Sequence, residues 1–117
     1  MIKPYEGTLR NAFLVRSEHL NHHGNLFGGD MMAKIDETAY CLLRQEHEEK
    51  TFVTRAAEIS FERPARLGDV VVFEAHILNV GNTSIQVEVF GSVSGVAICS
   101  ACMTYVCLDA GGKKTPI

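Results

Sequence analysis

The stretch that decides the fold is residues 21–36, NHHGNLFGGDMMAKID. It begins as a polar, glycine-rich loop that reaches about Phe27, and it continues as a helix that begins at about Gly28 or Gly29 and ends at Glu46. Because glycine has no side chain, two glycines at a helix N-terminus leave the first backbone N–H groups uncovered. We predict a loop that offers free N–H donors, followed by an amphipathic helix that carries a carboxylate.

The apolar side chains of this helix fall on one side, because at about 100° per residue they occupy a single arc. The arc consists of Met31, Met32, Ile35, Ala39, Leu42 and Leu43. Asp36 lies at the edge of the arc, whereas Glu37 lies on the opposite, solvated side. An acid at such an edge is either a structural carboxylate with a polar partner or a base at a functional site, and both readings stay open. The uncovered N–H groups ahead of it favour a site that polarises a carbonyl group and delivers water to it.

The rest of the chain predicts strands. The expected strands are residues 8–15 before the helix and residues 51–61, 70–80, 84–93 and 96–108 after it. The later strands follow one another through short turns rich in glycine, asparagine and serine. Consecutive strands joined by tight turns form an antiparallel sheet, and the helix must bury its apolar arc against one face of that sheet. The sequence therefore predicts an α+β fold in which one long helix packs on a five-stranded antiparallel sheet.

A sheet covered by a single helix leaves its other face and an edge open. A chain that is 46% hydrophobic is not expected to leave both in water, so a homodimer is expected. If two sheets join edge to edge about a two-fold axis, the two helices and their preceding loops come close together. A ligand site between protomers follows from this arrangement. The basic segment 109–117 is expected to be a flexible tail.

The composition narrows the classes of function. For 117 residues, of which 21% are charged, we expect a single globular domain over residues 1–117. A net charge of −3, without basic runs interleaved with aromatic residues, argues against nucleic-acid binding. The sequence has no secretory signal and no run of about eighteen apolar residues. We therefore expect a cytoplasmic protein without membrane contact.

Cysteine and histidine spacing argues against a metal or redox site. The four cysteines are Cys41, Cys99, Cys102 and Cys107. Cys99 and Cys102 form a CxxC pair on an expected strand, where residues three apart point to opposite faces and cannot share an ion. No acid or cysteine completes a ligand set for His19, His22 and His23. The sequence predicts small, buried, free thiols, no metal and no cofactor.

The arrangement of motifs resembles a known family. The loop N-x-x-G-N-x-F-G-G at 21–29 is followed by a helical aspartate seven residues after its second glycine. The stretches VTRAAEISFERPARLGDVV, VGNTSIQVEV and LDAGGKKTP extend the similarity over nearly the whole chain. This combination resembles the hotdog-fold acyl-CoA thioesterases, particularly the small bacterial YciA-like acyl-CoA hydrolases. The resemblance implies a hotdog fold, a dimer or dimer-based oligomer, and hydrolysis of acyl-CoA to a free acid and CoA.

The resemblance also implies roles for individual residues. Asp36 acts as general base or nucleophile, and Asn25 positions water or substrate across the dimer interface. Gly28 and Gly29 supply N–H donors for the thioester oxygen. Substrate contacts are expected at Asn21, Gly24, Phe27, Thr54, Arg55, Ser60, Arg63 and Lys113. Coenzyme A enters only as part of the substrate and product.

Two other functions share the scaffold. A non-catalytic acyl-CoA-binding regulatory domain is the serious alternative, although the sequence contains no helix-turn-helix or basic extension that would transmit a signal. Hotdog dehydratases carry a catalytic histidine in motifs that do not occur here. We therefore expect an enzyme, and specifically a thioester hydrolase.

Overall fold

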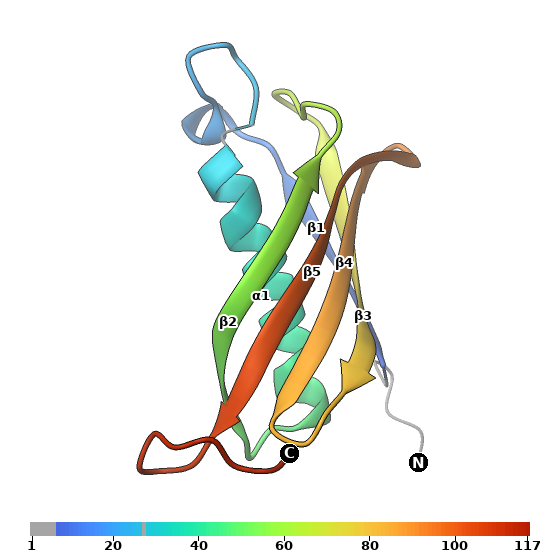
Figure 1. Ribbon diagram of the computed structural model, residues 1–117. Helices are drawn as coiled ribbons and strands as arrows, with labels where there is room; N and C mark the ends of the chain where they lie inside the picture. Colours follow the sequence, from blue (N-terminus) through green and yellow to red (C-terminus); the bar gives the residue numbers. More distant parts are fainter. Residues whose placement is uncertain (1–6, 27) are drawn as a thin grey trace.

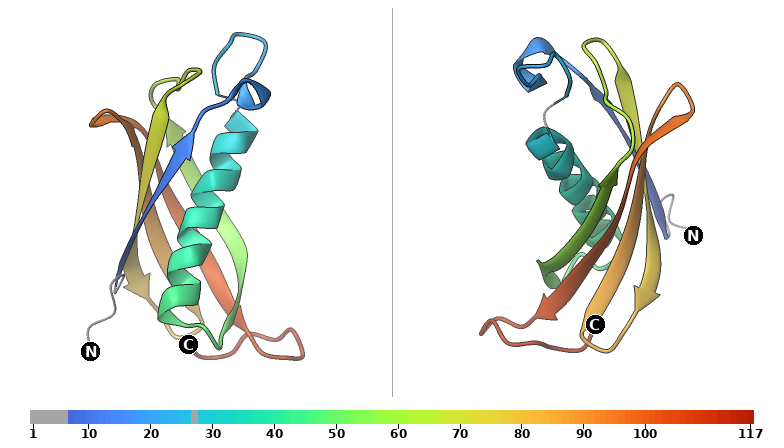
Figure 2. Two further views of the ribbon diagram at one scale, coloured as in Figure 1. Left: turned by 180° about the vertical axis from the view of Figure 1, so that it is seen from behind. Right: turned by 45° about the horizontal axis from the view of Figure 1, so that its top comes forward.

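The computed structural model describes residues 7–26 and 28–117. Its elements are β1 (Thr8–Leu14), a 3-10 turn η1 (Ser17–His19), α1 (Gly28–Glu46), β2 (Thr51–Phe61), β3 (Val70–Val80), β4 (Ser84–Val93) and β5 (Val96–Leu108). The strands form one antiparallel sheet in the order β1-β3-β4-β5-β2. Figure 1 shows α1 lying across one face of this sheet, and Figure 2 shows the strands curving around the helix. The predicted hotdog fold is confirmed.

The element boundaries agree closely with those expected from the sequence. The helix and the four later strands begin and end where they were predicted, while β1 ends at Leu14, one residue before the expected end. The β4–β5 hairpin shows why such boundaries can be predicted from the sequence. Ser94 and Gly95 both have positive φ, 48° and 79°, as a two-residue hairpin turn of this kind requires.

The core lies between α1 and the sheet. The buried helix residues include Met31, Ile35, Ala39, Leu42 and Leu43, which were all expected there. Met32 is the exception, because 47% of its surface is exposed. It shares nearly the same wheel angle as the buried Leu43, so its height along the helix, near the first turn, decides its exposure.

The sheet directs alternate side chains toward the helix. On β5 the buried residues Cys99, Met103 and Tyr105 face α1, and the intervening Cys102 faces away from it. Gly91 of β4 leaves room for the side chains of its partners on β3 and β5. A Cβ placed there would lie 2.5 Å from the Cys99 sulfur and 3.1 Å from the Phe73 ring.

The strand β2 forms one edge of the sheet. It pairs with β5 along one side, and no other strand of the described residues pairs with its second side. Nearly all of its residues are exposed, including Val53 and Phe61 at 44% and 49%. A register shift between Thr54 and Ala56 marks a bulge at Arg55. This long, apolar edge is a surface suited to pairing with another strand.

Two expectations about the rest of the chain are corrected. The thiols are free, as predicted, but Cys41 is exposed on the helix and Cys102 is only partly buried. The segment 109–117 is not a flexible tail, because it folds back on the strands. The Thr115 N–H donates to the Cys107 carbonyl at 3.0 Å, and the Ile117 N–H donates to the Asn82 carbonyl at 2.9 Å.

Candidate functional site

Asp36 lies in the middle of α1, at the edge of its buried face. Its Oδ1 accepts a hydrogen bond from the Tyr105 hydroxyl at 2.7 Å and another from the Thr54 hydroxyl at 3.3 Å. Thr54 and Tyr105 are paired residues on β2 and β5, so two neighbouring side chains of the sheet hold the carboxylate. Among the described residues, none donates a hydrogen bond to Oδ2. The carboxylate is fixed through one oxygen and open through the other.

Tyr105 is a site residue that the sequence did not single out. It is fully buried on the inner face of β5, and its ring packs edge-on against Tyr40 with centroids 6.2 Å apart. Burial, and then the hydrogen bond to Asp36, raise the pKa of the Tyr105 phenol well above its usual range. The available signal was its position, because a hydroxyl on an otherwise apolar strand face needs a buried partner.

The loop before α1 is organised by Asn21. Its side-chain oxygen accepts hydrogen bonds from the backbone N–H groups of His23 at 2.9 Å and Asn25 at 3.2 Å. Its backbone N–H donates to the Asn25 carbonyl at 2.7 Å, and Gly24 closes the turn with a φ of +80°. The side-chain nitrogen of Asn21 makes no hydrogen bond with any described residue. The loop is therefore rigid, and one amide NH₂ group remains free.

A pocket of about 330 Å³ opens beside this loop. We call it the loop pocket. Its lining residues are Asn21, Asn25, Leu26, Gly28, Met31, Phe61, Glu62, Arg63 and Pro64. The loop is attached to the segment that follows β2. The Leu26 N–H donates to the Ala65 carbonyl at 2.7 Å, and Asn25 forms an isolated β-bridge with Arg66. The pocket therefore combines the start of α1 with the end of β2.

Among residues 7–26 and 28–117, no packing contact requires a glycine at the start of α1. A Cβ at Gly28 would meet no atom within 4 Å, and its φ is not positive. Open space at a helix N-terminus with uncovered N–H groups is suited to a ligand that carries a partial negative charge. Gly29, its predicted companion, is exposed.

The carboxylate and the loop pocket are separated within one chain. Gly28 and Asp36 are eight residues apart on α1, which corresponds to about 12 Å along the helix axis. Asp36 does not line the loop pocket. The structure thus shows two partial sites, one built around Asp36 and one around the loop.

The other predicted contact residues are distributed over these parts. Thr54 binds Asp36, and Arg63 lines the loop pocket. Arg55 is exposed at the β2 bulge, near the edge of the sheet. Lys113 lies in the loop after β5, which Figure 1 shows at the opposite end of the molecule from the start of α1. The predicted contact at Phe27 falls outside the described residues.

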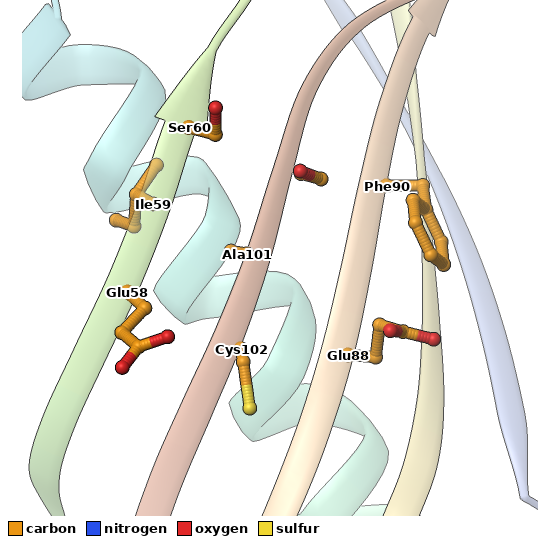
Figure 3. Close-up of a pocket in the computed structure, with 8 residues that line it drawn as sticks. Glu58, Ile59, Ser60, Glu88, Phe90, Ala101 and Cys102 are labelled. Carbon is orange, nitrogen blue, oxygen red and sulfur yellow. The ribbon is translucent and has the colours of Figure 1, made fainter.

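Ser60 lies on a different surface from Asp36. It lines a second pocket, of about 320 Å³, on the face of the sheet that α1 does not cover (Figure 3). Glu58, Cys102 and Glu88 project from three neighbouring strands into this outer-face pocket. Burial, and then the two glutamates, raise the pKa of the Cys102 thiol. The sheet separates this pocket from the Asp36 carboxylate, so the two belong to different surfaces.

Within the ranges 7–26 and 28–117, no three His, Cys, Asp or Glu residues are grouped closely enough to hold a metal ion. Helix α1 lacks the run of apolar residues that a membrane-crossing helix needs, and no other described helix has one.

Comparison with known families identifies the scaffold. The profile of the Thioesterase superfamily matches residues 23–102. The acyl-CoA thioester hydrolase YciA of Salmonella typhimurium is 28% identical over 121 aligned positions, which cover 96% of this chain and 91% of that protein. The acetyl-coenzyme A thioesterase of Rattus norvegicus is 34% identical over 82 positions, which cover 70% of this chain and 15% of that protein.

Solved structures show the same fold. An acyl-CoA hydrolase of Staphylococcus aureus, in complex with butyryl coenzyme A, coenzyme A and coenzyme A disulfide, superposes with a TM-score of 0.85 at 27% identity. The match covers 95% of this chain and 69% of that one. An apo-hexameric acyl-CoA thioesterase superposes with a TM-score of 0.88 at 27% identity, covering 97% of this chain and 77% of that one.

Proposed function

Because the chain belongs to the Thioesterase superfamily and is a thioester hydrolase, we propose that it hydrolyses acyl-CoA to a free acid and CoA with water activated by Asp36. The observation that carries this proposal is the Asp36 carboxylate, which is anchored through Oδ1 and unoccupied at Oδ2 by the described residues. The relatives named as acyl-CoA thioester hydrolases, and the solved hydrolase with butyryl coenzyme A, support the substrate class.

The proposed reaction is a direct hydrolysis. Asp36 removes a proton from a water molecule as the water oxygen attacks the thioester carbon. The N–H groups of Gly28 and Gly29 bind the carbonyl oxygen as it gains negative charge. The carbon–sulfur bond then breaks, and the CoA thiolate leaves and takes up a proton. A thiolate is a good leaving group, so these groups are sufficient for the reaction.

We propose that each complete site is shared between two chains. A water bound to Asp36 cannot reach a carbonyl held at Gly28 of the same chain, because the two positions are about 12 Å apart along the helix. Antiparallel pairing of two β2 edges about a two-fold axis places the Thr54 end of one strand beside the Phe61 end of the other. The Asp36 carboxylate of one chain then faces the loop pocket of its partner. The exposed β2 edge supports this dimer.

We assign the positioning amide to Asn21 in preference to Asn25. The side-chain oxygen of Asn21 is bound by the loop, which leaves its NH₂ group to donate toward the loop pocket. The Staphylococcus aureus hydrolase has been solved with alanine replacing an asparagine and, separately, an aspartate fifteen positions later. Asn21 and Asp36 have this same separation. Asn25 instead donates its backbone N–H to Asn21.

The nucleotide phosphates of CoA require cations. Arg63 is the best placed candidate, because it lines the loop pocket next to the start of α1. Arg55 lies on the β2 edge and would reach the same region from the partner chain. Guanidinium groups bind phosphate oxygens through pairs of N–H donors.

Release of free thiol from a panel of acyl-CoAs of increasing chain length tests the proposal, with butyryl-CoA included. We expect turnover by the wild type and a fall of about a hundredfold or more for Asp36→Ala, because the general base is lost. Asn21→Ala should lower turnover, and it should lower it more than Asn25→Ala does. Undiminished turnover in Asp36→Ala would remove Asp36 from the mechanism. Tight binding of every acyl-CoA without thiol release would contradict hydrolysis itself.

A further inference from the structure

The hydroxyl of the buried Tyr105 donates its hydrogen bond to a carboxylate. Its side chain is completely buried in the core, and its hydroxyl donates to the Asp36 Oδ1 atom at 2.7 Å. A phenylalanine would fill the same space among apolar neighbours without requiring any hydrogen-bond partner. Packing therefore does not require the Tyr105 hydroxyl, and its role is the hydrogen bond to the carboxylate.

The contact restricts how Asp36 can turn. Tyr105 approaches from β5 and Thr54 from β2, and both donate to the same carboxylate oxygen. Rotation of the carboxylate would break both hydrogen bonds. The Tyr105 bond is the shorter, at 2.7 Å against 3.3 Å, and its donor is held in the core, whereas Thr54 is exposed. Tyr105 is thus the more rigid of the two supports.

The Tyr105 phenol also keeps its proton and therefore stays a hydrogen-bond donor. Burial and the neighbouring Asp36 carboxylate raise the pKa of Tyr105, so its proton stays on the phenol oxygen throughout the range in which enzymes work. The other titratable group packed on this ring is Tyr40 of α1. A permanently protonated phenol favours the negatively charged carboxylate, which is the form that accepts a proton from water.

The geometry points to Tyr105 as a positioning residue that fixes Asp36 through Oδ1 and leaves Oδ2 to accept a proton from the attacking water. This inference rests on the proposed function, because it assigns Asp36 to the activation of water. Tyr105 itself touches neither substrate nor water. It acts by keeping the orientation of the base constant.

The test is Tyr105→Phe, which removes one oxygen atom and keeps the ring. We expect kcat for butyryl-CoA to fall about tenfold with little change in KM, since one charge-assisted hydrogen bond is lost.

Thr38→Val is the matched control for stability. Thr38 is a fully buried residue on the same helix, and its hydroxyl bonds to the Lys34 carbonyl at 2.7 Å without contacting Asp36. This variant loses that hydrogen bond and a longer one of 3.5 Å that the hydroxyl accepts from the Asn11 side chain, so its melting temperature should fall at least as much. Its kcat should stay close to that of the wild type. An equal fall in kcat for Tyr105→Phe and Thr38→Val would show that Tyr105 has only a structural role.

The Asp36→Ala background separates this inference from the proposed function. If Tyr105 acts through Asp36, then Tyr105→Phe has no further effect on turnover in Asp36→Ala. A further tenfold loss in that background would overturn the positioning role while leaving Asp36 as the base. An active Asp36→Ala enzyme would instead contradict the proposed function.

Discussion

A shared active site makes a quantitative prediction for mixed dimers. In a dimer of one Asp36→Ala chain and one Asn21→Ala chain, one site carries both replacements and the other carries neither. Such a mixed dimer should have about half of the wild-type turnover. A random assembly of the two chains contains about half mixed dimers, so the whole sample should show about a quarter of the wild-type rate. Each variant alone should be nearly inactive.

The measurement uses co-expressed chains with two different affinity tags. Mixed dimers are purified by both tags in sequence, their composition is verified by mass spectrometry, and thiol release from butyryl-CoA is followed. The matched control pairs a wild-type chain with a chain that carries both replacements. If the site is shared, every site in this control has one defect, and the mixed dimer should be nearly inactive.

A site contained within one chain reverses both results. The mixed dimer of single variants would then stay inactive, while the control dimer would keep about half of the wild-type turnover from its intact chain. That outcome would refute the argument from the distance between Gly28 and Asp36. A shared site and a site within one chain therefore predict opposite results in both experiments.

Three further results are expected. Gly28→Ala should fold normally, because its methyl group would meet no atom within 4 Å, but thiol release should fall about tenfold as the methyl group obstructs the approach of substrate to the N–H donors. Gly91→Ala should lower the free energy of unfolding by about 1–3 kcal/mol in urea titrations, since its Cβ would overlap the Cys99 sulfur; an unchanged unfolding midpoint would contradict this close packing. A disulfide reagent at pH 8 should modify the exposed Cys41 within minutes and leave Cys99 unmodified until the protein unfolds, because burial raises the pKa of Cys99 to about 11; early labelling of Cys99 by mass spectrometry would count against the structure.

Much of the fold could be predicted from the sequence because its signals are local. The helix from Gly28 to Glu46 and the strand from Thr51 to Phe61 were predicted with their observed ends. Glycine pairs, turn residues and alternating apolar positions all act within a few residues. Met32 was placed wrongly in the core, since a helical wheel gives the angle of a side chain but not what lies opposite it at that height. The folded segment 109–117 was also missed, because its hydrogen bonds to Asn82 and Cys107 depend on the finished hairpin.

The candidate site was only partly readable. The position of Asp36 at the edge of the buried face follows from helical spacing, and the structure places it there. Its partner Tyr105 is 69 positions away in the sequence, and their contact exists only through the register of β5 against the helix. The organising role of Asn21 depends on a turn whose hydrogen bonds a linear motif does not reveal. Local patterns thus located the proposed base, while tertiary contacts determined what holds it.

The exposed edge of β2 has a consequence for the life of the protein in a cell. A folded but solitary chain displays eleven residues of strand along which an unrelated extended peptide could align. The bulge at Arg55 interrupts this template but does not remove it. The proposed dimer would cover this edge, so a low concentration of the protein should leave more chains unpaired and shorten their lifetime.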